Sequence, residues 1–151
     1  MSRNVRRKAF TLIEVLIVVI IMAVLAATII PQFSSSTKDA KDSSLLFNLH
    51  TIRSQIEMYK IHHLGEYPEF DNFVDQMTKK TNIGGTLTGG EVIYGPYVQG
   101  EIPNNPFNNS NVVVKVATAG AVPTAVVSGG TDGWQYDETT GGFYPNNPEA
   151  Y

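Results

Sequence analysis

A carboxylate stands at the entrance of a long apolar segment near the start of the chain. Glu14 directly precedes residues 15–27, a run of thirteen apolar residues. As a helix, residues 10–30 would span about 31 Å, which is close to the apolar thickness of a bilayer. An ionisable side chain on such a helix costs on the order of 3 kcal/mol at mid-bilayer and less near the helix end, and it is usually kept because a partner requires it. Glu14 is therefore the first candidate for a functional residue.

The residues around Glu14 form a short motif. Basic Arg6, Arg7 and Lys8 precede the small Ala9, and the chain continues Phe10-Thr11-Leu12-Ile13-Glu14. This motif resembles the cleavage and methylation motif of type IV prepilins and of type II secretion pseudopilins. The resemblance implies that a prepilin peptidase cuts between Ala9 and Phe10 on the cytoplasmic face and methylates the new amino group of Phe10. The family usually has glycine in place of Ala9; alanine is also small, and we still expect cleavage.

The same resemblance implies that Phe10, Glu14 and Pro31 take part in filament assembly. In a filament, the Glu14 carboxylate can meet the cationic amino group of Phe10 on a neighbouring subunit, and a partly buried pair of this kind is sensitive to loss of either charge. Pro31 lacks an N–H and its ring clashes with the carbonyl of Ala27, so by itself it predicts a kink or a local loosening. Its position resembles that of a proline in family members whose helices melt there on assembly.

Three other interpretations of the N-terminal segment compete with this one. A secretory signal peptide would have the same basic start and apolar core, but Glu14 would then lie inside that core. An unprocessed single-pass anchor would be held by the basic residues Arg3, Arg6, Arg7 and Lys8 in the cytoplasm. A buried helix of a soluble protein is disfavoured by the unbroken apolar run.

Charge and cysteine content limit the classes of partner. The chain has 151 residues, with 11 basic and 14 acidic side chains and no cysteine. Four basic residues precede Phe10, so the remainder carries 7 basic and 14 acidic side chains, a net charge of −7. This charge disfavours nucleic acid as a partner, and the lack of cysteine excludes disulfides and thiol chemistry. Packing, alone or with a bound ion, must stabilise the exported domain.

Apolar side chains continue at helical spacing beyond the apolar segment. Leu45, Leu49, Ile52, Ile56 and Tyr59 follow one another at intervals of three or four residues. This pattern predicts a helix with one buried stripe, and Gly65 is a typical stop. We therefore predict one long helix from Phe10 to His63, apolar on all sides in its first half and amphipathic in its second.

Turn residues divide the rest of the chain into short elements. Phe70, Phe73, Val74 and Met77 predict a short amphipathic helix after Pro68. Five segments favour short strands, the last two as a hairpin: residues 92–94, 112–117, 124–127, 134–137 and 142–144. Together these elements predict a pilin-like α+β fold in which a small antiparallel sheet packs on the long helix.

Three further motifs narrow the resemblance. They are Gly65-Glu66-Tyr67-Pro68, Gly95-Pro96-Tyr97 and Ile102-Pro103-Asn104-Asn105-Pro106-Phe107. In this order, they resemble the major pseudopilin of the type II secretion system, whereas adhesive pilins typically carry a cysteine pair near the end. The implied division is a cytoplasmic leader (1–9), a transmembrane and assembly helix (10–30), its amphipathic continuation (31–65) and a periplasmic α/β loop with a small sheet (66–151).

A late loop raises the question of calcium. Members of this subfamily often bind Ca2+ in such a loop, and the resemblance implies Asp132 and Asp137 as its ligands. Carboxylate oxygens close together suit Ca2+. The sequences Asp132-Gly133 and Glu138-Thr139-Thr140-Gly141 are also typical of plain turns, so both interpretations stay open. Residues 112–127 form an apolar, alanine-rich insertion without an assigned role.

No arrangement of residues predicts catalysis. His50, His62 and His63 have no metal-spaced partner, and we expect all three at the surface. The glycines do not form a phosphate-binding loop before a helix. A membrane-anchored periplasmic hydrolase would rest only on the unassigned carboxylates Glu66, Glu69 and Asp71. We therefore predict that the chain is not an enzyme and has no catalytic residues.

The sequence thus predicts a structural subunit of a type II secretion pseudopilus. We expect a single-pass inner-membrane protein with its N-terminus in the cytoplasm and its C-terminal domain in the periplasm, which then polymerises through its N-terminal helix. The implied partners are copies of itself, a prepilin peptidase, an inner-membrane assembly platform with its ATPase, and minor pseudopilins. The alternatives are a subunit of a type IV pilus or DNA-uptake system, and a non-polymerising, membrane-anchored periplasmic binding domain.

Overall fold

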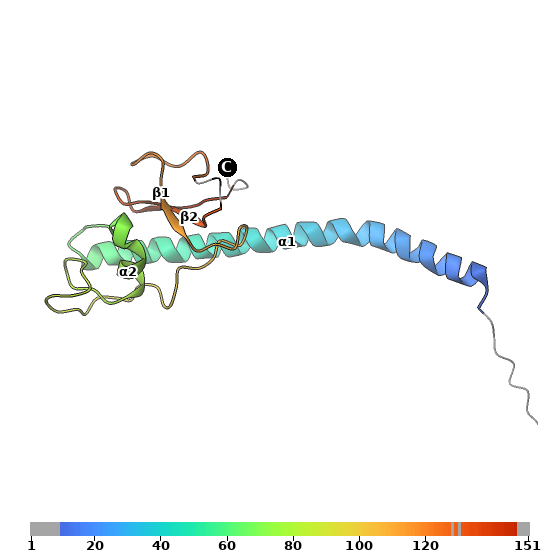
Figure 1. The fold of residues 1–151 in the computed structure, drawn as a ribbon, viewed down its shortest axis with the longest axis horizontal. Helices are drawn as coiled ribbons and strands as arrows, with labels where there is room; N and C mark the ends of the chain where they lie inside the picture. Colours follow the sequence, from blue (N-terminus) through green and yellow to red (C-terminus); the bar gives the residue numbers. More distant parts are fainter. Residues whose placement is uncertain (1–9, 128, 130, 148–151) are drawn as a thin grey trace, which may run out of the picture. The chain divides into compact units, whose positions relative to one another are not determined.

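The computed structural model describes residues 10–127, 129 and 131–147, and of Pro31, Gln32 and Ser34 the backbone alone (Figure 1). The expected leader, with Ala9, lies outside these residues. The chain forms two compact units, Met1–Ala40 and Lys41–Tyr151. The division predicted from the sequence has four parts, 1–9, 10–30, 31–65 and 66–151, which were defined by expected function and not by compactness. That division stays a prediction.

One long helix carries the first part of the chain. Helix α1 (Leu12–His62) has 51 residues, which confirms the long helix predicted over residues 10–63. The helix continues through Pro31. The kink expected at this proline stays a prediction. The helix ends where Leu64 and Gly65 adopt positive φ angles of 59° and 91°, and the Gly65 N–H donates to the carbonyl of Lys60 at 2.9 Å. This left-handed ending is the stop that Gly65 predicted.

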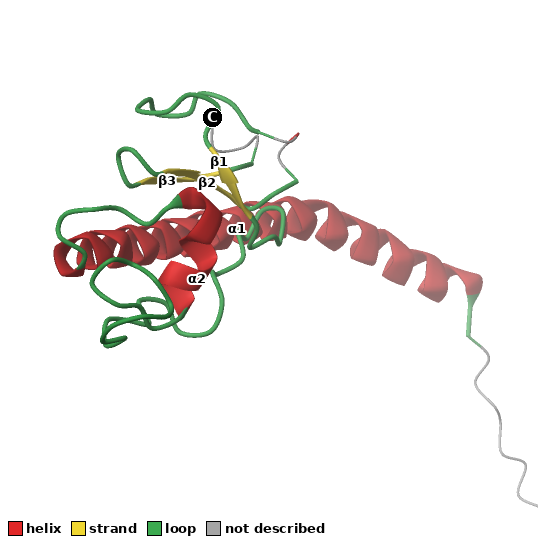
Figure 2. Cartoon of the chain, turned by 60° about the vertical axis from the view of Figure 1, so that its left-hand side comes forward, coloured by secondary structure: helices red, strands yellow, loops and turns green. Residues whose placement is uncertain are grey.

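The second unit contains a three-stranded sheet beside the C-terminal part of α1 (Figures 1 and 2). Its strands are β1 (Val113–Lys115), β2 (Trp134–Asp137) and β3 (Gly142–Pro145), in the order β1-β2-β3. The predicted hairpin is confirmed, because β2 and β3 pair antiparallel, with Tyr136 opposite Phe143. The prediction that the whole sheet is antiparallel is wrong. β1 runs parallel to β2, because the long connection after Lys115 brings the chain back in the same direction.

The other predicted elements are confirmed in part. Residues 70–78 form the short 3-10 helix η1 (Phe70–Asn72) and helix α2 (Phe73–Thr78), as expected after Pro68. Residues 92–94 form no strand; Tyr94 makes an isolated antiparallel bridge with Thr81 instead. Residues 124–127 are also irregular, and the Val127 N–H donates to the side chain of Asn146 at 2.8 Å rather than to a neighbouring strand.

The predicted stripe forms the helical side of the core. Leu45, Leu49, Ile52, Ile56 and Tyr59 are all buried. They join the aromatic side chains Trp134, Tyr136 and Phe143 of the sheet in one cluster, together with Phe73 and Met77 of α2. The α+β fold is therefore the predicted one: a long helix whose amphipathic part packs on a small sheet.

The three motifs beyond the helix serve this packing. The Tyr136 hydroxyl donates to the carbonyl of Pro68 at 2.8 Å, and the Tyr97 N–H donates to the carbonyl of Met77 at 2.9 Å. The indole N–H of Trp134 donates to the carbonyl of Pro103 at 2.7 Å. Asn105 is fully buried, and its amide donates to the carbonyl of Gly133 at 2.8 Å. Each motif thus satisfies polar groups around the core.

Candidate assembly site

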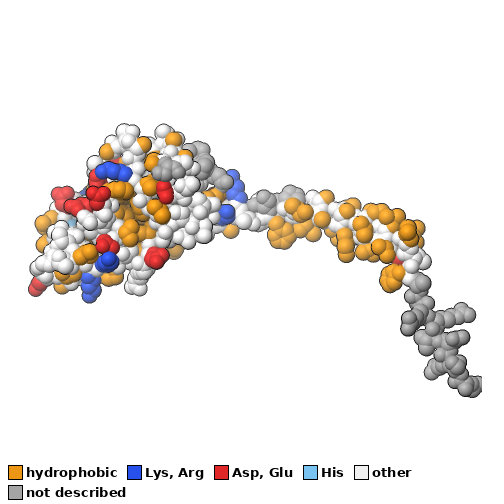
Figure 3. All heavy atoms as spheres, viewed as in Figure 1, with side chains coloured by type: hydrophobic (Ala, Val, Ile, Leu, Met, Phe, Trp, Pro, Cys, Tyr) orange, Lys and Arg blue, Asp and Glu red, His pale blue; other side chains and the backbone are white. Residues whose placement is uncertain are grey.

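The N-terminal part of α1 presents exposed apolar side chains along its length, and Figure 3 shows one face of them. The helix contains a stretch long and apolar enough to cross a membrane, and none of that stretch is buried within the structure. Phe10 is 85% exposed and Ile20 is 54% exposed. A continuous apolar surface of this length is not stable in water, so it requires lipid or other protein around it. The helix therefore provides the membrane-anchored, single-pass arrangement that the sequence predicted.

Glu14 is held by Thr11 at the first turn of this helix. Thr11 directly precedes the first helical residue, and its N–H and its hydroxyl each donate to Glu14 Oε2 at 2.8 Å. The Glu14 N–H donates in return to Thr11 Oγ1 at 3.4 Å. This reciprocal pair is a capping box, which satisfies two N–H groups at the helix start. The spacing Thr-x-x-Glu, at Thr11 and Glu14, is the sequence signal of this capping box.

The capping box changes the energetics of the charge. A carboxylate at a helix N-terminus is favoured by the helix dipole, and a cap of this type adds further stabilisation of the helix start. Together these terms offset part of the cost of a charge next to a bilayer core. Both bonds from Thr11 end on Oε2, and within the described residues no hydrogen bond is seen to the second carboxylate oxygen of Glu14.

The structure describes less of the other residues expected to act in processing and assembly, Ala9, Phe10 and Pro31. Phe10 directly precedes the capping box and is exposed, so its backbone nitrogen lies near the helix start. Pro31 lies within the assigned helix, and its side chain is outside the described part. The cleavage site between Ala9 and Phe10 is described on one side only. Cleavage, methylation and the roles of these residues in assembly stay predictions.

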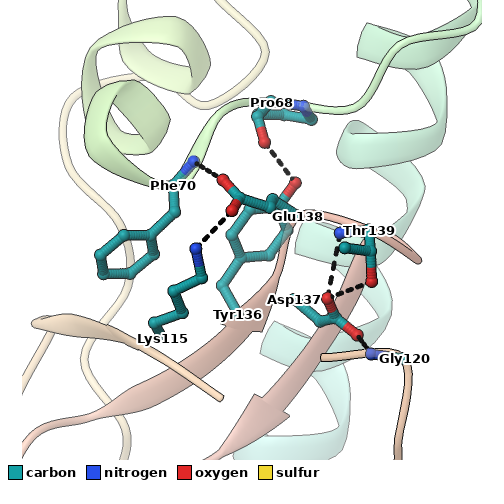
Figure 4. A network of polar contacts seen from close by, with 8 residues as sticks. All are labelled: Pro68, Phe70, Lys115, Gly120, Tyr136, Asp137, Glu138 and Thr139. Atoms are coloured by element: carbon teal, nitrogen blue, oxygen red, sulfur yellow. Dashed lines mark hydrogen bonds and ion pairs between the residues drawn. The ribbon is translucent and has the colours of Figure 1, made fainter. Parts of the chain in front are cut away.

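Asp137, a candidate calcium ligand, is buried at the end of β2 (Figure 4). Its Oδ1 accepts the N–H of Thr139 at 3.0 Å and the hydroxyl of Thr139 at 2.6 Å. Its Oδ2 accepts the N–H of Gly120 at 2.7 Å and the hydroxyl of Thr140 at 2.9 Å. Burial by itself raises the pKa of Asp137, but the hydrogen bonds from Thr139, Gly120 and Thr140 outweigh it and lower that pKa below its ordinary value.

The second candidate ligand does not join this group. Asp132 precedes β2, whereas Asp137 ends it, and the contacts of Asp132 run through its backbone carbonyl, which accepts the side-chain amides of Asn108 and Asn146 at 2.8 and 3.2 Å. Among the described residues, no three His, Cys, Asp or Glu side chains gather as a metal site. With both oxygens of Asp137 taken by N–H and O–H donors, these residues do not fit a Ca2+ ion as they are arranged.

The histidines are not all at the surface. His50 is exposed, as expected, but His63 is buried, and its surface placement was wrong. The reason is its position four residues after Tyr59, which continues the buried stripe; the two rings stack with centroids 3.8 Å apart. Its Nδ1 lies 3.0 Å from the carbonyl of Ile83, and its Nε2 lies 3.1 Å from the Tyr97 hydroxyl. Burial, with a smaller contribution from His62, lowers the pKa of His63.

The three carboxylates of the hydrolase hypothesis lie at the surface, where Glu66 and Glu69 line one pocket. Glu66, Glu69 and Asp71 are all exposed. Glu69 Oε2 accepts the side-chain amide of its neighbour Asn72 at 2.8 Å, which is a local surface contact.

Comparison with known protein families agrees with this architecture. The family model for the type II secretion system (T2SS), protein G matches residues 32–142, and that for the prokaryotic N-terminal methylation motif matches residues 4–30. The chain belongs to the type II secretion system protein G family. It is thus a pseudopilin, a structural class of protein rather than an enzyme, and the resemblance inferred from the sequence is confirmed.

Several individual proteins of this family are similar to the chain, and each is called type II secretion system core protein G. The chain is 32% identical over 75 residues to the type II secretion system core protein G of Pseudomonas aeruginosa and 28% identical over 75 residues to that of Dickeya chrysanthemi. These two matches cover 50% of the chain and about half of each relative, 52% and 48%. The match to core protein G of Vibrio cholerae is 24% identical and covers 93% of the chain and 92% of the relative. No solved structure gives a significant match.

Proposed function

We propose that this chain is the structural subunit of a type II secretion pseudopilus, which polymerises through its N-terminal helix to help move exported proteins across the outer membrane. The observation that supports this function is the fully exposed apolar part of α1, headed by a capped carboxylate. Such a surface has two stable environments, a bilayer before assembly and the packed helices of a filament after it.

The charge pair at the N-terminus drives the transfer between these environments. A prepilin peptidase cuts between Ala9 and Phe10 and methylates the amino group of Phe10, which keeps its positive charge. In the filament, that amino group meets the carboxylate of Glu14 on a neighbouring subunit. Partial burial makes the pair sensitive to loss of either charge. Pro31 loosens the helix as the subunits pack.

The remaining partners follow from the family. An inner-membrane assembly platform with its ATPase adds subunits, and minor pseudopilins form the tip. The N-terminus lies in the cytoplasm and the second unit in the periplasm, first at the inner membrane and then in the filament. The second candidate, an anchored periplasmic binding domain without a polymer, would need the same apolar helix but neither cleavage at Phe10 nor Glu14.

Mass spectrometry of the mature N-terminus tests the processing step. We expect a chain that begins with methylated Phe10. Because the peptidase needs a small side chain before the cut, Ala9→Gly should be processed at least as fast as the parent, while Ala9→Leu should accumulate as precursor. An intact Met1, or equal processing of all three chains, would contradict the assignment of the cleavage site.

Variants of Glu14 test the assembly step. Glu14→Leu makes the helix more compatible with lipid, so insertion should be at least as efficient while filament formation falls sharply. Glu14→Gln keeps an acceptor for the Thr11 cap but removes the charge, and it should fail in the same way. Glu66→Leu, which removes an exposed carboxylate of the second unit, is the control and should assemble normally. Parental levels of filaments from Glu14→Leu would refute the charge-pair mechanism.

A further inference from the structure

The long connection between β1 and β2 is tied to the β2–β3 turn at one buried side chain. Residues 116–133 form this connection, and they include most of the alanine-rich insertion. Gly120 lies in it, and its N–H donates to the carboxylate of Asp137, 17 residues further along the chain. Thr139 and Thr140, in the turn that follows β2, donate to the same carboxylate (Figure 4 draws Gly120 and Thr139).

The carboxylate of Asp137 is saturated by these donors. An ionised carboxylate offers about four lone-pair sites, two on each oxygen. Each Asp137 oxygen accepts two hydrogen bonds, one from an N–H and one from a hydroxyl. A Ca2+ ion requires about six to eight oxygen ligands that point lone pairs at it. Here, the two threonine hydroxyls point hydrogens at the carboxylate, so the positive ends of four dipoles surround it.

Positive charge is also supplied nearby by the chain itself. Lys115, the last residue of β1, forms an ion pair with Glu138, the residue after Asp137. Glu138 accepts the N–H of Phe70 at 2.9 Å as well, so its carboxylate is committed to protein donors. The Lys115 ammonium is also near enough to Asp137 and Asp71 to be favoured by both charges. A lysine at this position repels a divalent cation.

We propose that this region is held together without calcium. The Asp137 carboxylate joins the insertion to the β2–β3 turn by accepting hydrogen bonds from Gly120, Thr139 and Thr140, and we call this arrangement the clasp. Lys115 balances the local negative charge. The clasp gives residues 116–127 their role, which is to connect two parallel strands while staying fastened at Gly120. It is independent of the proposed assembly function, because none of its residues belongs to the N-terminal helix.

Thermal unfolding of the full chain in detergent separates the clasp from a calcium site. Trp134 is the single tryptophan and is fully buried, so its fluorescence reports on the second unit. The clasp predicts the same Tm in millimolar CaCl2 and in EDTA. A calcium site predicts a rise of several degrees when Ca2+ exceeds its Kd a hundredfold, and reversal by EDTA. A rise that is lost in both Asp132→Ala and Asp137→Ala would overturn the proposal.

Hydrogen exchange of the Gly120 amide tests the clasp directly. Asp137→Ala and the double variant Thr139→Val, Thr140→Val should both lower the Tm and speed exchange at Gly120 at least several-fold, whereas Asp132→Ala should leave both unchanged. The double variant keeps every carboxylate, so it decides the question even where Asp137→Ala does not fold. Unchanged exchange at Gly120 in the double variant would also overturn the proposal.

Discussion

Helix α1 contains two kinds of apolar surface, and they differ in where their partners lie. Before residue 40, its large apolar side chains are exposed, as Ile20 is at 54%; after residue 41, one stripe is buried, as Ile56 is at 0%. The residue types are the same on both sides of this boundary. The apolar surface of the first part is therefore available to lipid or to other proteins. The apolar stripe of the second part is buried and stabilises the fold of its own domain.

The two central carboxylates differ in the same way. Glu14 is held by Thr11 alone, three residues away on its own helix turn. Asp137 is held from a turn and from a distant connection, and both of its oxygens are occupied. A carboxylate with local partners can exchange them without unfolding the domain. One that fastens separate segments together cannot, which agrees with the proposed role of Glu14 in assembly and with a structural role for Asp137.

The largest effect is expected from a buried aromatic side chain. Phe143 is fully buried, with its ring centroid 5.2 Å from that of Trp134. Phe143→Ala should lower the free energy of unfolding of the second unit by about 3–5 kcal/mol, because it removes apolar contacts and leaves a cavity. The matched control is Phe47→Ala on the exposed side of α1, which should change it by less than about 0.5 kcal/mol. Chemical denaturation followed by Trp134 fluorescence measures both. Equal losses would show that Phe47 is covered.

Two isoleucines on α1 compare the two regions directly. Ile56→Ala should destabilise the second unit by about 2–5 kcal/mol, since the side chain is fully buried. Ile20→Ala should leave that stability unchanged and should act on filament yield instead, because its partners lie outside the chain. Denaturation curves and electron microscopy of filaments separate the two outcomes. A loss of domain stability in Ile20→Ala would break the division between the regions.

A smaller effect on the stability of the second unit is expected from removal of the buried Tyr136 hydroxyl. Tyr136→Phe removes the hydrogen bond to the carbonyl of Pro68, which is also buried. An unsatisfied carbonyl of this kind costs about 1–3 kcal/mol. The control is Tyr144→Phe, which keeps the ring that lies 5.5 Å from the Arg53 guanidinium and should be nearly neutral. The difference in urea midpoint between the two variants is the measurement.

The smallest effect is a pH dependence that arises in the second unit alone. Burial lowers the pKa of His63 in the folded protein below its unfolded value of about 6.5. The unfolded state therefore binds the proton more readily, so stability is full above about pH 6.5 and falls as the pH drops through the folded pKa. Urea midpoints measured from pH 7.5 to 5 should decrease. His63→Gln should flatten this slope, whereas His50→Gln, at an exposed position, should retain it.

Much of the fold followed from local patterns. The stripe from Leu45 to Tyr59 predicted which face of α1 is buried, and the short segments 134–137 and 142–144 predicted the β2–β3 hairpin. The direction of β1 did not follow, because a three-residue strand after a loop carries no signal of its partner. The surface position expected for His63 is wrong because its place four residues after Tyr59, on the buried stripe, outweighs its polar side chain.

By itself, the sequence determined the features that depend on neighbours in the chain: the apolar helix, the Thr11–Glu14 spacing, the buried stripe and the stop at Gly65. Each is set by helical periodicity or by backbone conformation within a few residues. The tertiary structure alone decided which groups from distant segments meet. It placed His63 against Tyr97, paired β1 parallel to β2, and brought the N–H of Gly120 to the carboxylate of Asp137. Such contacts depend on loop closure and on the packing of the whole domain, which no local pattern records.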